Sequence, residues 1–461
     1  MAPLSDRHTT TIAILGASMA IACIIAYRRR SARKAVTTAV SPDSCGSPPT
    51  TVGVPSAEAP SPKIDPEVKA QAAKHVKFGN MCARGGHTEK ALKHYALALE
   101  INPQNASAHH NSASICQRLN RFDEAIVHYK AALALKPNLV EAASNLAVAE
   151  LNAKRPADAV ATCRWAIALQ HEVYGTANLE ASHHLNVALR LLGRRDEAIE
   201  ATWRRIEELA AATDAKHASC AGWARPAPLK LLPGPAPLAT QAASLTVVCV
   251  KWGTLYGADY VNRLSRGARR ALGDGGVAAF ICFTDDSAGL DAEIEVRSLP
   301  AGQADWKGWW YKACLFAADA GLQGRVLYLD LDTVIVGSMQ PLRHYAGAFA
   351  TLSTVGFEAE EGNADGYNTS AMLWDAGEGG LGALHSALRG DVFQCLMRWD
   401  HWVEMVAPGA HLLQDAYPRL FVDYRLDCRE HGPPAEAAVV CFPRNPKPHE
   451  VESEWIAKHW V

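Results

Sequence analysis

Residues 325–336 read RVLYLDLDTVIV, an apolar, strand-like run interrupted by Asp330 and Asp332. Because alternate side chains of a strand share a face, both carboxylates are expected on one side while Leu329 and Leu331 pack on the other. Two neighbouring carboxylates repel one another unless a cation neutralises them. Mg²⁺ and Mn²⁺ take oxygen ligands in proteins. The motif therefore predicts a divalent-metal site, and the alternative is a pair of acids that caps a turn.

The sequence around this motif alternates between strand-like and helix-like segments. Such alternation indicates an α/β sheet whose ligand-binding loops lie at the strand ends. The expected strands cover residues 244–250, 278–284 and 325–336, and the expected helices lie near 258–272 and 309–320. We predict that residues 244–461 form one α/β domain.

Three segments of this domain carry a resemblance to a known family. Residues 309–342, WWYKACLFAADAGLQGRVLYLDLDTVIVGSMQPL, precede GYNTSAMLW, which contains Asn368, and NPKPHE, which contains Lys447. Together they resemble the core of nucleotide-diphospho-sugar transferases of the glycogenin and retaining-galactosyltransferase type, which share the GT-A fold. The resemblance implies a metal-dependent glycosyltransferase of the hexosyltransferase type, and by analogy a UDP-sugar as donor.

The resemblance also implies roles for individual residues. Tyr256 is similar to the family's aromatic residue that stacks on uracil, although Tyr256 or Tyr260 could instead belong to the core. Lys312 and Lys447 look like the ammonium groups that meet the donor diphosphate, or they could be solvated lysines. Asp330 would contact both the donor and the metal. The implied cofactor is Mn²⁺ or Mg²⁺.

Two departures from the family pattern affect the metal and catalytic residues. The family usually places a histidine ligand shortly before the Lys-Pro pair, and this chain has none there. The predicted metal ligands are therefore Asp330, Asp332 and His449, with water as the alternative to His449. The family's Asp-Gln pair is also missing in that order. The candidate catalytic residues are Asn368, Gln414 and Asp415, with Asp391 as an alternative.

Residues 68–212 repeat with a period of about 34 residues. Ala91, Tyr95, Ala98 and Pro103 recur as Ala125, Tyr129, Ala132 and Pro137, and Ala159, Ala166 and Ala198 continue the spacing. Small residues where two helices cross, with a proline that closes the second helix, are typical of tetratricopeptide repeats. We predict an all-α solenoid whose groove binds a protein or peptide partner, with an unrelated helical bundle as the alternative.

The amino-terminal segment has the features of a membrane anchor. Residues 9–27 are uncharged and mostly apolar, and as a helix they are long enough to span a bilayer. A cleaved signal peptide is the alternative. The proline-rich composition of residues 28–67 predicts a disordered stem, and that of residues 213–243 predicts a linker. Basic residues follow the span and favour a cytosol-facing protein, whereas a Golgi or ER transferase faces the lumen; both orientations stay open.

Net charge and a glycine motif bear on three other possible functions. The formal net charge of −2 gives no broad basic field, so nucleic acid is not an expected partner. Gly377, Gly379 and Gly382 form a GxGxxG pattern that could bind a dinucleotide instead. Another alternative is a membrane-tethered tetratricopeptide adaptor whose transferase-like domain is inactive. The expected partners are a nucleotide-sugar donor, an unidentified acceptor, a protein or peptide, and the membrane.

Overall fold

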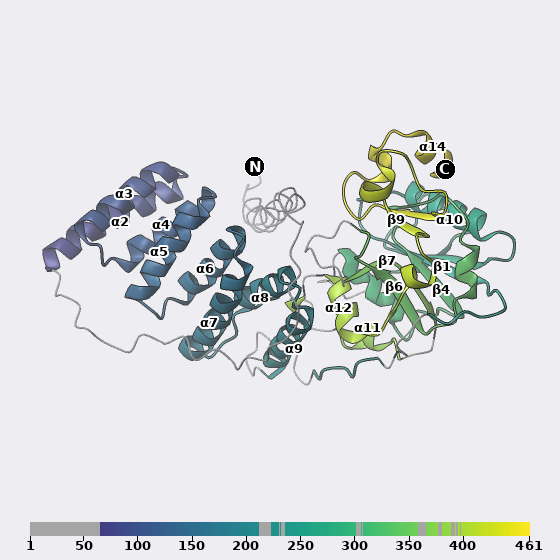
Figure 1. The fold of residues 1–461 in the computed structure, drawn as a ribbon, viewed down its shortest axis with the longest axis horizontal. Coiled ribbons are helices and arrows are strands. Elements are labelled where there is room, and N and C mark those ends of the chain that lie inside the picture. The colour runs from purple at the N-terminus through teal and green to yellow at the C-terminus, as the bar shows by residue number, and fades with distance from the viewer. Residues whose placement is uncertain are drawn as a thin grey trace, which may run out of the picture. The chain divides into compact units, whose positions relative to one another are not determined.

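The computed structural model describes residues 65–211, 223–229, 231, 236–300, 306, 308–357, 366–376, 380–388, 392, 395–396 and 398–461. The predicted anchor, residues 9–27, and the predicted stem up to residue 64 lie outside these ranges. Among the described residues, no helix combines the length and apolarity that a membrane crossing requires. Along the chain, a region of paired helices precedes an α/β region, as predicted (Figure 1).

The repeat region consists of antiparallel helix pairs. Its helices are α2 (Pro66–Arg84), α3 (Thr88–Ile101), α4 (Ala106–Arg118), α5 (Phe122–Leu135), α6 (Val140–Asn152), α7 (Pro156–Tyr174), α8 (Leu179–Leu191) and α9 (Arg195–Ala211). Within the pairs, α2 packs on α3, α4 on α5 and α6 on α7. The alanines predicted at the helix crossings are fully buried, namely Ala91, Ala98, Ala125, Ala132, Ala159, Ala166 and Ala198. The predicted helical repeats are confirmed.

Gly79 of α2 shows why the repeat requires small residues at its crossings. The ring of Tyr95, which is 2% exposed, lies so close to Gly79 that a Cβ atom there would overlap the ring. The Tyr95 hydroxyl donates a hydrogen bond to Asn80 Oδ1 at 2.8 Å, which fixes the ring in place. The close approach of α2 and α3 therefore depends on the missing side chain at position 79.

The chain divides into two compact units, Met1–Leu192 and Gly193–Val461. The division lies before the predicted solenoid boundary at residue 212, because α9 packs within the second unit. Trp203 and Ile206 of α9 belong to the apolar cluster that also contains Trp402, and the Trp203 and Trp402 ring centroids are 5.7 Å apart. The last helix of the repeat pattern is thus part of the core of the α/β unit.

The α/β unit is built on a mixed, seven-stranded sheet in the order β3-β2-β1-β4-β7-β6-β8. Its strands are β1 (Leu245–Lys251), β2 (Val277–Thr284), β3 (Glu295–Ser298), β4 (Arg325–Leu329), β6 (Phe349–Ser353), β7 (Tyr367–Asp375) and β8 (His411–Leu412). β1 pairs in parallel with β2 and β4, whereas β7 runs antiparallel between β4 and β6. β1 and β2 confirm the strands expected over 244–250 and 278–284.

A second sheet of three strands has the order β5-β10-β9. Its strands are β5 (Thr333–Ile335), β9 (Phe421–Asp423) and β10 (Val439–Cys441). The remaining helices of this unit are α10 (Ala258–Leu272), α11 (Ala383–Ser386), α12 (Trp399–Val406), α13 (Leu413–Ala416) and α14 (Glu454–His459). Short helical turns are η2 (Gly308–Phe316), η3 (Gln340–His344), η5 (Tyr424–Cys428) and η6 (Pro448–Glu450).

The large sheet has an apolar layer on each face. Along β1, Val247 and Cys249 belong to one cluster, together with Leu264 of α10. Val248 and Val250 belong to the other cluster, on the opposite face. This alternation follows from the two-residue period of a strand. A strand buried on both faces is mostly apolar, which explains the uninterrupted apolar run Val247–Val250 in β1.

The strand expected over residues 325–336 is in fact two strands in two sheets. β4 ends at Leu329, and the backbone N–H of Asp330 donates to the carbonyl of Ser370 in β7 at 2.9 Å. The carbonyl of Asp332 instead accepts from the N–H of Phe442, just after β10, at 3.1 Å. The chain changes sheets between the two acids, so Asp330 and Asp332 lie at the junction of the two sheets.

Of the two helices predicted for the α/β region, the structure contains one as an α-helix and the other as a 3₁₀ helix. The helix expected near 258–272 is α10 and is confirmed. The helix expected near 309–320 is the 3₁₀ helix η2, which ends at Phe316. It begins with Trp309, Trp310 and Tyr311, aromatic residues whose α-helix propensity is low. Of these three rings only Trp310 is buried, so the low helix propensity of the segment is the clearest reason for the 3₁₀ backbone.

Candidate functional site

The carboxyl ends of β1 and β4 are the natural place for a ligand in this sheet. From β1 the chain proceeds to β2 and β3 on one side, and then crosses to β4 on the other side of β1. Parallel neighbours whose connections leave in opposite directions form a crevice at their carboxyl ends, where α/β proteins bind ligands. Tyr256 follows β1, and Asp330 and Asp332 follow β4. The predicted motif thus lies at this switch point.

Asp330 is held by two donors from different elements. Lys312 Nζ in η2 lies 2.8 Å from Asp330 Oδ1. The hydroxyl of Tyr328 donates to the same oxygen at 2.5 Å. Lys312 also lies 5.1 Å from the centroid of the Tyr328 ring, within the range of a cation–π contact. The ammonium, the phenol and the carboxylate therefore form one compact group.

Hydrogen bonds to Thr369 of β7 hold Lys312 in place. Its Nζ donates to the carbonyl of Thr369 at 3.1 Å and lies 3.3 Å from the Thr369 hydroxyl. Thr369 is in turn fixed by Asp400 of α12, which accepts from its backbone N–H at 2.9 Å and from its hydroxyl at 2.5 Å. With a relative exposure of 8%, Lys312 is not the solvated lysine of the alternative interpretation.

Asp332 has an equivalent arrangement. Lys447 Nζ lies 2.6 Å from Asp332 Oδ2, and the Tyr256 hydroxyl donates to the same oxygen at 3.0 Å. Lys447 Nζ also donates to the carbonyl of Phe442 at 2.9 Å. The side chains of Lys447 and Asp332 are 17% and 14% exposed. We name Tyr256, Lys312, Asp330, Asp332 and Lys447 the switch-point cluster.

The charges of this cluster balance without any ligand, since two lysine ammonium groups face two aspartate carboxylates. Burial raises the pKa of Asp332, and the neighbouring Asp330 raises it further, whereas Lys447 and Tyr256 act in the opposite direction. Burial and the negative charge of Asp332 also raise the pKa of Tyr256, so this phenol remains a hydrogen-bond donor. Lys447 therefore compensates for the Asp332 carboxylate, which burial disfavours, and Lys312 pairs with Asp330.

The carboxylates fit part of a divalent-metal site. Each uses one oxygen for its lysine and its tyrosine, and among the described residues no hydrogen bond reaches Asp330 Oδ2 or Asp332 Oδ1. These two oxygens are hard ligands of the kind that Mg²⁺ and Mn²⁺ take. Further ligands would have to come from water or from a substrate phosphate.

The third predicted metal ligand, His449, lies in a different environment. Its Nδ1 forms a short hydrogen bond with the hydroxyl of Tyr260. Tyr260 in turn packs against Tyr256 of the cluster, with ring centroids 4.8 Å apart. In the part of the chain that the structure describes, no three His, Cys, Asp or Glu side chains form a group that could hold a metal. The predicted set of three protein ligands is therefore not assembled, because η6 directs His449 toward α10.

The candidate catalytic residues are not part of the switch-point cluster. Asn368 Oδ1 accepts a hydrogen bond from the Ser370 N–H at 3.0 Å. The amide of Gln414 bonds both the N–H and the carbonyl of Ser353 at the end of β6, each at 2.9 Å. Asp415 is exposed, and Asp391 lies outside the described residues. A catalytic role for these residues stays a prediction.

Sequence reasoning missed several residues of the site. Tyr328 precedes Asp330 by two positions, and this spacing alone places the phenol on the face of the carboxylate. Thr369 and Asp400 had no sequence signal, because their role depends on the packing of α12 against β7. Near Lys312, the side chains of Trp306 and Trp310 are buried, whereas that of Trp309 is 50% exposed.

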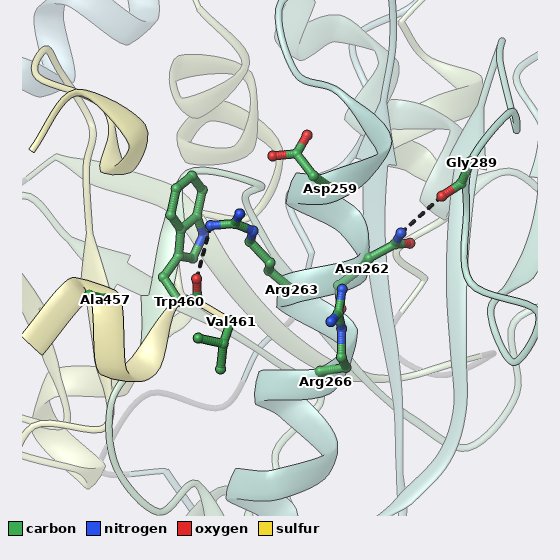
Figure 2. Close-up of a pocket in the computed structure, with 8 residues that line it drawn as sticks. All are labelled: Asp259, Asn262, Arg263, Arg266, Gly289, Ala457, Trp460 and Val461. Carbon is green, nitrogen blue, oxygen red and sulfur yellow. Dashed lines mark hydrogen bonds between the residues drawn. The ribbon is translucent and has the colours of Figure 1, made fainter.

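A pocket of about 600 Å³ lies between α10 and the carboxyl-terminal segment, where Arg263 and Trp460 line it. Arg263 of α10 stacks on Trp460, with its guanidinium carbon 4.2 Å from the ring centroid, and donates to the Trp460 carbonyl at 2.9 Å (Figure 2). The Trp460 ring contacts Tyr260 at a centroid distance of 4.9 Å. None of the switch-point residues lines this pocket.

The strand before the alternative dinucleotide motif is β7, which runs antiparallel to β4, so its carboxyl end lies at the sheet edge opposite to Asp330. Gly377 and Gly379 lie outside the described residues. A dinucleotide fingerprint requires a parallel strand that leads into a helix.

Comparison with known proteins identifies the repeat region. Residues 106–139 match the family described as tetratricopeptide repeat. Solved structures similar to this chain include YrrB, described as a TPR protein with an unusual peptide-binding site (22% identity, 31% of this chain and 71% of that one, TM-score 0.28). Another is the TPR2B domain of yeast Sti1 in a complex with pHsp70 (26% identity, 26% and 96%, TM-score 0.25). No curated protein matches the chain. The chain thus contains a tetratricopeptide repeat, followed by an α/β region with a mixed sheet.

Proposed function

We propose that residues 244–461 form a metal-dependent glycosyltransferase domain of the GT-A type that takes a hexosyl group from a nucleotide-sugar, a UDP-sugar in the first instance. The observation that carries this proposal is the switch-point cluster itself. Side chains from four separate segments, Tyr256, Lys312, the Asp330–Asp332 turn and Lys447, meet at the carboxyl ends of β1 and β4. These are the residues for which the family resemblance implies donor contacts.

The charge arrangement suits a metal–diphosphate ligand. In the protein alone, each lysine neutralises one carboxylate. A divalent cation with a diphosphate brings positive charge for Asp330 and Asp332, and negative charge for Lys312 and Lys447. Each charged side chain therefore exchanges one opposite charge for another, and no buried charge is left without a partner. A purely anionic or purely cationic ligand would leave one pair of side chains uncompensated.

The chain's own residues would then act mainly by positioning. Lys312 and Lys447 would meet the diphosphate oxygens as charged hydrogen-bond donors. Thr369 and Asp400 keep Lys312 directed at the site, and the Phe442 carbonyl does the same for Lys447. When bound to Asp330 and Asp332, a cation would supply neutralisation of the charge on the departing nucleoside diphosphate.

The solenoid has a different part in this proposal. Stacked repeats present an extended surface that suits a protein or peptide segment. We propose that this surface recruits the acceptor or a partner protein, which would raise the local concentration of the acceptor at the α/β domain. An anchor over residues 9–27 would hold the protein at a membrane of the Golgi or ER, or at the cytosolic face of a membrane.

One observation favours a second function, a tetratricopeptide adaptor with an inactive transferase-like domain. Both carboxylates are already paired with lysines, and the described residues supply no third ligand for a metal. If the ion pairs are the permanent partners of Asp330 and Asp332, the cluster would be a structural element. The α/β unit would then stabilise the chain without transferring sugar.

Hydrolysis of the donor by the purified protein separates the two functions. UDP-sugars would be screened for release of UDP in Mn²⁺, with water as the acceptor. The active protein should release UDP, and Asp332→Asn should abolish the release because the metal loses a charged ligand. Asp274→Asn is the matched control, since Asp274 lies exposed in the turn after α10 and should leave the rate unchanged.

The possible results have distinct meanings. Release that requires Mn²⁺ and disappears in Asp332→Asn supports the transferase. Absence of release with every UDP-sugar, together with no binding of UDP, supports the inactive adaptor. Release that persists in Asp332→Asn contradicts the assignment of this residue to the metal.

A further inference from the structure

The first two helix pairs of the solenoid each contain a pair of facing histidines. In α4 and α5, the Nδ1 atoms of His109 and His128 are 3.0 Å apart. In α2 and α3, the Nδ1 atoms of His75 and His94 are 3.5 Å apart. Both pairs join residues 19 positions apart, and equivalent histidines are separated by one repeat of about 34 residues. The repeat has therefore placed the same side-chain pair twice.

These distances match two neighbouring ligands of one metal ion. Metal–nitrogen bonds of about 2.0–2.1 Å with an angle of about 90–120° at the metal place two imidazole nitrogens about 2.8–3.6 Å apart. The His109–His128 distance lies at the lower end of this range, and the His75–His94 distance lies at the upper end. The helices would need little movement, but the rings would have to turn, because centroids 5.3 and 5.8 Å apart show that the Nδ1 atoms of each pair face one another head-on.

The second ring nitrogen of His109 has its own partner. His109 Nε2 lies 3.2 Å from the carbonyl oxygen of Pro103, an acceptor that requires the proton on Nε2. The lone pair of His109 is then on Nδ1, directed at His128. A backbone carbonyl that orients the ring through the non-coordinating nitrogen is the usual support of a metal-binding histidine.

The surroundings of His128 favour its neutral form. Burial lowers the pKa of His128, and the facing His109 lowers it further. Glu124 on the same helix opposes this shift, but its carboxylate is engaged by Arg121, at 2.7 Å for one of the two hydrogen bonds. All four histidines are partly exposed, so an ion can reach them from solution.

We propose that each of these two histidine pairs binds one late transition-metal cation, of the Zn²⁺, Ni²⁺ or Cu²⁺ class. Imidazole nitrogens select these cations over Mg²⁺ and Mn²⁺. The pairs supply two protein ligands per ion, because the described residues form no group of three. Water or a side chain of a bound partner completes the shell. Such an ion joins the two helices of one repeat and stabilises the folded pair.

The third repeat provides an internal comparison. Ala143 and Thr162 occupy the positions that correspond to His109 and His128. The fold of α6 and α7 therefore does not need the histidines, which indicates that the pairs in the first two repeats are not required by helix packing alone. The proposal accordingly assigns two ions to the solenoid and none to its third repeat.

Equilibrium dialysis of the full-length protein against NiCl₂ tests the proposal, with excess MgCl₂ present to occupy carboxylate sites. The unaltered protein should bind two equivalents of Ni²⁺ at these pairs. His128→Gln and His94→Gln should each lose one equivalent, and the double variant should lose both. His431→Gln is the matched control, since the side chain of His431 is 90% exposed and its neighbour at 3.9 Å is Glu430 rather than a second histidine.

Two results would overturn the proposal: equal Ni²⁺ binding by the unaltered protein and the double variant, or absence of binding by the unaltered protein. In that case the pairs are neutral imidazole hydrogen bonds only. If a glutamine variant fails to fold, electron paramagnetic resonance of Cu²⁺ bound to the unaltered protein decides the question. Coupling to imidazole nitrogens supports the proposal, and a signal without it contradicts the proposal.

Discussion

Lys447 Nζ lies 2.6 Å from Asp332 Oδ2, although the two residues are 115 positions apart in the chain. Lys447 follows β10 of the small sheet, and Asp332 precedes β5 of the same sheet. The pairing of these two strands brings the charges together, since Cys441 of β10 is opposite Thr333 of β5. The small sheet therefore positions one lysine of the switch-point cluster.

This ion pair should behave as a coupled unit. Lys447→Met leaves the Asp332 carboxylate mostly buried without its cation, and we expect the free energy of unfolding to fall by about 1–3 kcal/mol. Adding Asp332→Asn removes the uncompensated charge, so the double variant should be more stable than Lys447→Met alone. Urea unfolding followed by tryptophan fluorescence measures the difference.

The exposed pair Arg419–Glu436, at 2.7 Å, is the control for this cycle. Its side chains are 58% and 52% exposed, so Arg419→Met should cost less than about 1 kcal/mol. If the effects of Lys447→Met and Asp332→Asn simply add, the two charges are not coupled and the description of the cluster is wrong.

Trp203 should matter for the stability of the α/β unit, although it lies in the last helix of the repeat pattern. It is 2% exposed and packs against Trp402 of α12. Trp203→Ala should lower the free energy of unfolding by about 3–5 kcal/mol, because a large cavity forms in that core. Thermal unfolding monitored at the C-terminal unit provides the measurement.

Trp165 of α7 is the matched control, since it is 40% exposed. Trp165→Ala should change the free energy of unfolding by about 0.5 kcal/mol or less. A similar cost for both substitutions would argue against the assignment of α9 to the second unit.

Gly79→Ala should destabilise the first repeat. The new Cβ would overlap the buried ring of Tyr95, and overpacking of this kind costs about 1–3 kcal/mol. Gly85→Ala is the control, because a Cβ there meets its nearest atom at 3.4 Å and the backbone has an ordinary φ of −78°. Circular dichroism melting of both variants tests the difference; a Gly79→Ala protein as stable as the control would contradict the packing described here.

The solenoid should lose stability in mild acid because of His184. Burial lowers the pKa of this histidine to about 4, and its Nδ1 has no hydrogen-bond partner among the described residues. The unfolded chain, with an ordinary pKa of about 6.5, binds the proton more readily. Stability is therefore complete above about pH 6.5 and decreases as the pH falls toward 4, by at most about 3 kcal/mol from this group.

Melting temperatures between pH 4 and 7 measure this dependence. His184→Gln should flatten the slope in that range, since glutamine does not titrate. A slope that stays unchanged in His184→Gln would assign the acid sensitivity to other groups.

The sequence predicted most reliably what local spacing determines. The recurrence of Ala91 and Ala125 one repeat apart identified the helix pairs, and the apolar pattern located α10 at Ala258–Leu272. Asp330 and Asp332 were recognised from their spacing alone, but the change of sheet between them was not. That change depends on Ser370 and Phe442, which are distant in the chain.

The other differences between the predicted and the observed site also arise from tertiary contacts. Only the family resemblance indicated that Lys312 and Lys447 belong to the site. The sequence around a single lysine does not show which side chain it will pair with. The resemblance implies a histidine ligand before the Lys-Pro pair, and His449 is the candidate because this chain has no histidine there. Its bond to Tyr260 reflects the direction of η6, which the sequence does not specify.

On our proposal, the switch-point cluster exchanges its ion pairs for a metal and a diphosphate when the donor binds. Isothermal titration of UDP into the full-length protein, in Mn²⁺ and again in EDTA, measures this exchange. We expect binding in Mn²⁺, none in EDTA, and weaker binding in Lys447→Met. Equal binding in both buffers, or no binding in either, would show that the cluster is not a metal–diphosphate site.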